Sequence, residues 1–366
     1  MKTSFLIASM LVPFASGAIA QSSVTLFGTI DLNARYVKND GSARRLSLSQ
    51  DGLNQSQLGF RGTEDLGGGL RAGFTLISTV NADTGSVNGK FFNRRSTVSL
   101  SGPWGELRLG RDYVPTFWNN ALFDPFGANG VGNSFNVWQL QSTYAGSPAF
   151  GNFVRSDNSI GYFLPPGLGG VYGQAMVGAS EGASNQGRAI SARIGYASGP
   201  FDIAFAAGQQ RFDLAANAGV TGVTAGSNQK TYNFGASYDL QVVKLLGIVD
   251  RDTRSNLTET RGSISAVIPF GVSEVHLGYS RSKLTNDLAH NTNTDTSYQV
   301  SYQYNLSKRT ALYTTVARLS NGHNPLAGVT QSVAGWNAVY AGTAQTAPPV
   351  PGGKSTGFEI GVRHFF

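Results

Sequence analysis

The sequence contains no cysteine among its 366 residues. This absence excludes a disulfide framework and thiolate metal sites, although the N-terminus indicates export to an oxidising compartment. Charged residues are also scarce, at 13% of the chain, against about a quarter in ordinary soluble proteins. Beyond the N-terminal segment there is no long apolar run. A membrane β-barrel explains this combination, because each strand shows lipid only its alternate residues.

The N-terminal segment 1–20 has the layout of a cleavable secretory signal. It combines the basic Lys2 with an apolar body and the small-residue ending Ala18-Ile19-Ala20. We expect the mature chain to begin at Gln21 and residues 21–366 to form a single domain. A transmembrane anchor is the alternative reading, but the apolar body is shorter than the ~18 residues that a spanning helix needs.

Other functional classes lack support in the sequence. The formal net charge is +7, but the basic residues are scattered along the chain and form no Lys/Arg run of the kind that binds nucleic acid. The histidines are dispersed too, and none is paired with another histidine at a metal-ligand spacing. We therefore expect no enzymatic activity, no cofactor, no metal and no nucleic-acid partner.

Alternation of apolar and polar residues is the dominant pattern. From Val24 to Tyr36 one parity is apolar and the other mostly polar, the period of a β-strand with two different faces. Such a strand is long enough to cross a bilayer at a tilt. The unit recurs, and the sequence predicts sixteen strands near 22–37, 54–64, 70–82, 91–101, 105–112, 155–164, 170–179, 189–198, 201–211, 230–239, 242–252, 259–268, 273–283, 295–305, 309–320 and 355–366.

The connections between these strands alternate in length. Short turns, such as 198–200, contain Gly and Pro, which supply tight backbone geometry. Longer polar connections lie between them, near 38–53, 83–90, 113–154, 180–188, 212–229, 253–258, 284–294 and 321–354. Short periplasmic turns opposite long external loops are typical of outer-membrane barrels. The last predicted strand can pair with the first, so we predict an all-β fold, a closed sixteen-stranded antiparallel transmembrane β-barrel.

Several motifs stand in order along the whole of the predicted mature chain. They are Ser23-Val24-Thr25-Leu26-Phe27-Gly28, Leu58-Gly59-Phe60-Arg61-Gly62-Thr63-Glu64-Asp65-Leu66-Gly67-Gly68-Gly69-Leu70, Arg94-Arg95-Ser96-Thr97-Val98-Ser99-Leu100, Gly105-Glu106-Leu107-Arg108-Leu109-Gly110-Arg111, Asn305-Leu306-Ser307-Lys308-Arg309-Thr310 and Gly361-Val362-Arg363-His364-Phe365-Phe366. Together they resemble the general diffusion porins of Gram-negative outer membranes.

The resemblance implies a homotrimer in the cell outer membrane, in contact with lipid and lipopolysaccharide. Each barrel would be a water-filled channel for the passive diffusion of ions and small hydrophilic solutes. The resemblance also implies that the third external loop folds into the lumen as a constriction. Counting the long connections along the chain independently makes 113–154 the third of them.

In this family a basic cluster on the barrel wall faces acidic groups on the inserted loop. By position, Arg94 and Arg155 match the basic cluster, with charges at the external rim as the alternative reading of both. Gln57 stands where relatives often carry an arginine. A neutral amide there removes one fixed charge from the wall.

The acidic side of the constriction is also reduced. Asp124 is the candidate on the loop, and Asp112 is a second candidate near the loop root. The third predicted strand has Ile77 where relatives often place a glutamate. Because fixed charges in a narrow passage act directly on permeating ions, the remaining wall implies a mild preference for anions.

Two aromatic residues of the same loop, Trp118 and Phe126, are expected to wedge it against the wall rather than to stack on solutes. Two functional alternatives to general diffusion stay open. One is a substrate-specific channel, recognised by saturable block with one solute. The other is an adhesin or receptor barrel that acts through its external loops, of which 212–229 and 321–354 are among the longest.

Overall fold

The computed structural model describes residues 23–87, 89–142, 153–180, 188–212, 227–324, 331–333 and 349–366. The predicted leader and Gln21 lie outside the described residues, as do 143–152 of the predicted constriction loop and most of the connections 180–188, 212–229 and 321–354. Among the described residues, no helix is long and apolar enough to span a membrane.

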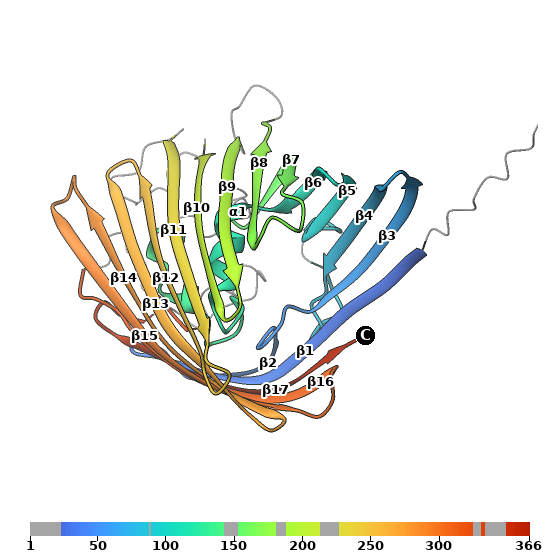
Figure 1. The fold of residues 1–366 in the computed structure, drawn as a ribbon. Helices are drawn as coiled ribbons and strands as arrows, with labels where there is room; N and C mark the ends of the chain where they lie inside the picture. The colour runs from blue at the N-terminus through green and yellow to red at the C-terminus, as the bar shows by residue number, and fades with distance from the viewer. Residues whose placement is uncertain are drawn as a thin grey trace, which may run out of the picture.

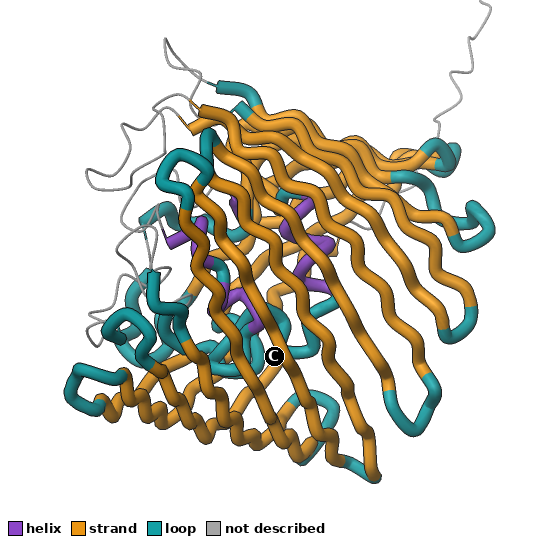
Figure 2. The backbone as a smooth tube through the Cα atoms, turned by 90° about the vertical axis from the view of Figure 1, so that its left-hand side faces the viewer, coloured by secondary structure: helices purple, strands orange, loops and turns teal. Residues whose placement is uncertain are grey.

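In the described part of the chain, strands form one antiparallel sheet that closes on itself (Figure 1). The strands are β1 (Ser23–Asn39), β2 (Arg45–Gln50), β3 (Gln57–Gly67), β4 (Leu70–Thr79), β5 (Arg95–Gly102), β6 (Gly105–Tyr113), β7 (Arg155–Phe163), β8 (Val171–Gly178), β9 (Ala189–Ser198), β10 (Phe201–Phe212), β11 (Ser227–Asp239), β12 (Lys244–Arg254), β13 (Leu257–Phe270), β14 (Ser273–Asn286), β15 (Asn291–Asn305), β16 (Thr310–Ser320) and β17 (Lys354–Phe365). Figure 2 shows their tilt, with tight turns at one end of the barrel.

Closure runs through β1. One edge of β1 pairs with β17, from Thr29 opposite Phe365 to Asn39 opposite Ser355. The other edge pairs first with β3 and then with β2. β2 and β3 thus occupy one position of the wall in succession, and the predicted sixteen-stranded closed barrel is confirmed.

The local differences from the predicted strands have simple causes. β2 lies inside the predicted connection 38–53, because only six residues alternate there and they pair along β1. The predicted connection 253–258 is reduced to a tight turn at Ser255 and Asn256, because β12 and β13 pair as far as Arg254 and Leu257. Ser255 adopts a positive φ of 51° there.

The two faces of the wall differ as the alternation predicts. On β1, Asp31 and Asn33 point into the lumen and are buried, whereas Val24 and Leu26 on the other parity are exposed. The outward face continues this pattern around the barrel with large apolar side chains, among them Ile190, Ile194, Val249, Ile264, Val300, Leu312, Val316 and Ile360. An apolar outer surface over a polar interior is the arrangement that lipid requires.

The described residues of the connection between β6 and β7, 114–142 and 153–154, lie inside the barrel, and we name them the inserted loop. It carries α1 (Pro115–Leu122), the 3-10 turn η1 (Ser134–Val137) and the short α2 (Gln139–Ser142). Proline at the first turn of α1 favours helix initiation, since its missing N–H would have no partner within the helix. In Figure 1 α1 stands within the ring of strands, and Asn119 bonds the lumen-facing Asn233 of β11. The third long connection therefore folds inward, as the resemblance implied.

Candidate functional site

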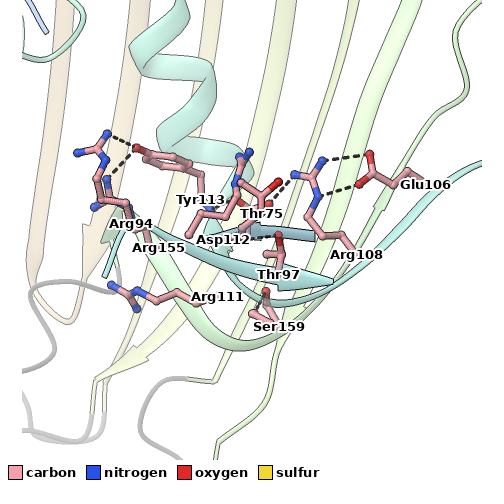
Figure 3. A network of polar contacts seen from close by, with 12 residues as sticks. Thr75, Arg94, Thr97, Glu106, Arg108, Arg111, Asp112, Tyr113, Arg155 and Ser159 are labelled. Carbon is pink, nitrogen blue, oxygen red and sulfur yellow. Dashed lines mark hydrogen bonds and ion pairs between the residues drawn. The ribbon is translucent and has the colours of Figure 1, made fainter. Parts of the chain in front are cut away.

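Five arginines lie where β5, β6 and β7 meet the root of the inserted loop, and Figure 3 labels four of them. This arginine cluster consists of Arg94, Arg95, Arg108, Arg111 and Arg155. Arg94 directly precedes β5 and Arg95 is its first residue. Arg108 and Arg111 lie in β6, and Arg155 is the first residue of β7. Strand pairing between β5, β6 and β7 thus brings together residues that are up to about sixty positions apart in the sequence.

A bulge in β7 lies beside Gly110 of β6. Gly110 pairs with Ser159 and Asp112 with Ser156, so Asp157 and Asn158 of β7 lie opposite the single Arg111 of β6. Gly110 has a φ of 122°, and a Cβ atom there would lie 2.1 Å from the carbonyl oxygen of Ser96. Only glycine fits this position of β6, and the extra residue in β7 re-aims the neighbouring side chains of that strand.

Asp112 lies between two arginines of the cluster. Its carboxylate accepts a hydrogen bond from Arg95 Nε at 2.7 Å and another from Arg108 NH1 at 2.6 Å. Arg108 also binds Glu106 with two bonds of 3.0 Å each. The side chains of Arg95 and Arg108 are 23% and 17% exposed, so these paired guanidinium groups still reach the lumen.

Arg94 and Arg155, the two arginines expected at the constriction, meet at one atom. Both donate through NH2 to the hydroxyl oxygen of Tyr113, each at 2.8 Å. They are more deeply buried than Arg95 and Arg108, with exposed fractions of 9% and 2%. Figure 3 shows the two guanidinium groups on the same side of the phenol ring. Sequence reasoning did not single out Tyr113, although it stands directly after Asp112 at the loop root.

Arg111 differs from the other four arginines, because it shares the outward parity of Leu107 and Leu109 on β6. It donates to Asp157 of β7 at 2.6 Å and to the carbonyl oxygen of Asn93 at 2.6 Å. Lys90 ion-pairs with the same aspartate. Three carboxylates, those of Glu106, Asp112 and Asp157, are therefore distributed among five guanidinium groups and one ammonium group.

Asp124 takes a different place from the one expected of an acidic group facing the arginines. It is buried, and its carboxylate accepts the backbone N–H groups of Phe126 and Ala128, each at 3.1 Å. This is a turn held by an aspartate that bonds its own backbone. Burial raises the pKa of Asp124 above its ordinary value. It is the only acidic or basic residue between positions 114 and 154.

The remaining predicted residues surround the lumen. Gln57 opens β3 opposite Thr29 and shares its lumen-facing parity. Trp118 packs on Tyr113 with ring centroids 5.2 Å apart. Phe126 lies edge-on to His276 of β14 at 5.9 Å. The aromatic pair thus joins the inserted loop to its root and to the wall.

Buried wall carboxylates hold the inserted loop in place. Glu259 of β13 accepts the backbone N–H groups of Gln139 at 2.8 Å and Leu140 at 2.7 Å. Glu359 of β17 accepts the N–H of Val131 at 3.2 Å. Sequence reasoning missed these anchors, although an acidic residue on the lumen parity of a membrane strand is a signal that could have found them. Within the described residues, no group of three or more His, Cys, Asp or Glu side chains could hold a metal ion.

Comparisons with known proteins agree with this architecture. The sequence profile described as "Gram-negative porin" matches residues 7–324. Outer membrane porin protein 32 of Delftia acidovorans is 37% identical over 379 residues, covering 99% of each chain. The solved structure of the anion-selective porin from Comamonas acidovorans has a TM-score of 0.79 at 33% identity, covering 94% of this chain and 100% of that one.

A more distant structure shares the fold alone. The trimer form of OmpT from Vibrio cholerae, folded in vitro, has a TM-score of 0.65 at 11% identity, covering 94% of this chain and 99% of that one. The family match and the alignment over nearly the full chain together identify an outer-membrane channel for passive diffusion, and not an enzyme. The chain belongs to the Gram-negative porin family.

Proposed function

We propose that this porin lets anions pass in preference to cations, and that the arginine cluster is the source of the preference. The observation that carries the proposal is an imbalance of fixed charge. On the wall, Arg95 and Arg108 share the carboxylates of Asp112 and Glu106, and Arg94 and Arg155 donate to the neutral hydroxyl of Tyr113, whereas the inserted loop brings a single carboxylate that is buried and bonded to its own backbone. The loop side of the passage therefore adds no charge to oppose the wall.

The physical reason is that a narrow passage with low-dielectric walls focuses the field of its fixed charges. Positive potential raises the local concentration of anions and lowers that of cations, so selectivity follows the net charge of the lining. Arg94, Arg155, Gln57 and Asp112 line the constriction in this proposal. Asp124 shapes the loop rather than the field. A relative at 33% identity is named an anion-selective porin, which supports the same sign.

Zero-current potentials of the purified protein in planar bilayers test this proposal. In a KCl gradient the potential is expected to have the sign of chloride selectivity. Arg95→Gln and Arg108→Gln are each expected to shift it toward cations. Arg251→Gln is the matched control, because Arg251 is exposed on the outward parity of β12 and leaves the lumen unchanged. A cation-selective potential in the unaltered protein would overturn the proposal.

We further propose that the mature chain begins at Gln21 and assembles as a homotrimer in contact with outer-membrane lipid and lipopolysaccharide. The apolar outward face supports the lipid contact. The trimer form of the related OmpT fold supports the assembly. Native mass spectrometry of protein extracted from outer membranes tests both the leader and the assembly, since it reads the chain mass and the number of chains. A monomer, or a chain that retains its leader, would contradict the corresponding part.

A further inference from the structure

Tyr113 joins three parts of the constriction. Its hydroxyl oxygen accepts hydrogen bonds from Arg94, which precedes β5, and from Arg155, which opens β7. Its ring lies 5.9 Å from Phe117 in a stacked geometry and 5.2 Å from Trp118 of α1. One side chain thus connects two wall strands to the first turn of the inserted loop.

The arrangement places two like charges close together. Two guanidinium groups that donate to the same oxygen at 2.8 Å repel each other, since both carry a full positive charge. The phenol oxygen offsets this repulsion by accepting two charge-assisted bonds, each stronger than a bond between neutral groups. The guanidinium carbon of Arg155 also lies 4.4 Å from the centroid of the Tyr113 ring, within the range of a cation–π contact.

The arginines that bond Tyr113 differ in exposure from the other arginines of the cluster. Arg94 and Arg155 are 9% and 2% exposed, and both stand where the wall meets the root of the inserted loop. Arg95 and Arg108, which bind the Asp112 carboxylate instead of the Tyr113 hydroxyl, remain more exposed. The two arginines that bond the phenol thus expose less of their charge than Arg95 and Arg108 do.

We propose that Tyr113 is a positioning residue for ion selectivity, which holds Arg94 and Arg155 against the loop root and so limits the positive charge that reaches the lumen. This inference rests on the proposed anion preference. It states that the Tyr113 hydroxyl group limits how strong that preference is. Removal of the hydroxyl takes away the acceptor that the two guanidinium groups share, while Arg94 keeps the attraction of the nearby Asp51 carboxylate. The repulsion between the two groups then favours conformations in which they lie further apart.

Tyr113→Phe tests the inference, because it keeps the ring and its stacking on Phe117 and Trp118. The ratio of anion to cation permeability is expected to rise by about twofold, a modest step against the tenfold or larger effects that charge-lined passages produce. Tyr162→Phe is the matched control, since the Tyr162 hydroxyl bonds the carbonyl oxygen of Trp104 at the exposed periplasmic turn. That variant should keep the potential of the unaltered protein.

A mutant cycle separates positioning from general disturbance. In an Arg94→Gln/Arg155→Gln background, Tyr113→Phe should leave the potential unchanged, because the charges that it releases are absent. An unchanged ratio in Tyr113→Phe alone, or a shift toward cations, would refute the role of Tyr113. If Tyr113→Phe fails to insert into bilayers, Arg155→Lys tests the same contact from the other side, and it should raise the ratio by loosening the shared acceptor.

The two proposals fail in different ways. The potential of the unaltered protein tests the anion preference by its sign. The difference between Tyr113→Phe and the unaltered protein tests the positioning role, whatever that sign is.

Discussion

Asp124 is the residue whose environment decides what the inserted loop contributes to the pore. Its carboxylate accepts two backbone N–H groups of its own loop and is buried. The expectation of an acid facing Arg94 and Arg155 came from sequence position alone, and position does not show where a side chain points. A short polar side chain followed by Pro125 and Gly127 is a turn signal as well as a charge, and the turn role accounts for its contacts.

Asp124→Asn is therefore expected to change stability with pH rather than selectivity. Burial raises the pKa of Asp124 above the value of about 3.9 in an unfolded chain, so the folded state disfavours the ionised form. The free energy of unfolding contributed by this group is fully present below about pH 4 and is lost as the pH rises through the raised pKa. The variant should lose this part of the pH dependence.

Unfolding in denaturant, measured at acidic and neutral pH for both proteins, checks the expectation, because the difference between them isolates one group. The zero-current potential should stay within error of the unaltered value. A clear move toward anions would return Asp124 to the pore lining and contradict its place as a buried turn residue.

The residues of the arginine cluster show how far sequence reasoning reached. Arg94 and Arg155 were located by their positions at the starts of predicted strands. Arg95 and Arg108 lie in the quoted motifs but needed the register of β5 against β6 to be placed beside Asp112. The role of Tyr113 could be found only from the three-dimensional structure, since its two arginine partners lie 19 and 42 residues away in the sequence.

At the level of elements, the inserted loop is held in place because carboxylates of the wall strands accept hydrogen bonds from its backbone N–H groups. Glu259 is fully buried and binds two backbone N–H groups at the start of α2, together with the Ser282 hydroxyl at 2.5 Å. Backbone N–H groups at a helix start need such acceptors when they are away from water. The loop thus depends on β13 for its final helical turn.

Glu259→Gln should loosen this end of the loop. The new amide turns a donor toward a backbone donor, and each hydrogen bond to a charged group contributes about 1.5–3 kcal/mol. We expect noisier single-channel current at constant voltage and a lower free energy of unfolding. Glu64→Gln is the matched control, because Glu64 is exposed near the short turn that joins β3 to β4. Equal noise in both variants would count against the anchor.

Glycines on the lumen face let the loop approach the wall. A Cβ atom on Gly235 of β11 would lie 2.1 Å from the ring of Phe123, which is buried in the inserted loop. Gly235→Ala is expected to destabilise the packed loop by about 1–3 kcal/mol, the usual cost of overfilling a packed interior. Gly247→Ala on neighbouring β12 is the control, since its nearest atom would lie at 3.7 Å.

Thermal unfolding of the two variants, followed by circular dichroism, separates the outcomes. Gly235→Ala should unfold at a clearly lower temperature than Gly247→Ala, which should stay close to the unaltered protein. If the two midpoints coincide, the close packing of Phe123 against β11 contributes little to loop stability.

For the whole molecule, the closure of the barrel and the difference between its inner and outer faces both follow from the alternation of apolar and polar residues. Alternation predicted the strand count and the closing pair, because both depend only on which residues face lipid and which face water. β2 escaped prediction because a six-residue strand carries too few alternations to stand out from a polar connection. The placement of the inserted loop against β9 to β17 followed from side-chain contacts, which periodicity does not encode.

The same added charge should therefore have opposite outcomes on the two faces of the wall. Gln57→Arg adds a guanidinium group on the lumen parity of β3, so we expect a normal yield of folded barrel and a potential shifted toward anions. Ile264→Arg places the same group on the outward face of β13, where Ile264 is 66% exposed. An arginine facing lipid costs roughly 2–4 kcal/mol near the bilayer midplane, so folding into lipid vesicles should be impaired. Folding yield by gel mobility and the zero-current potential read the two effects separately. Impaired folding of Gln57→Arg, together with unimpaired folding of Ile264→Arg, would mean that the faces have been assigned in reverse.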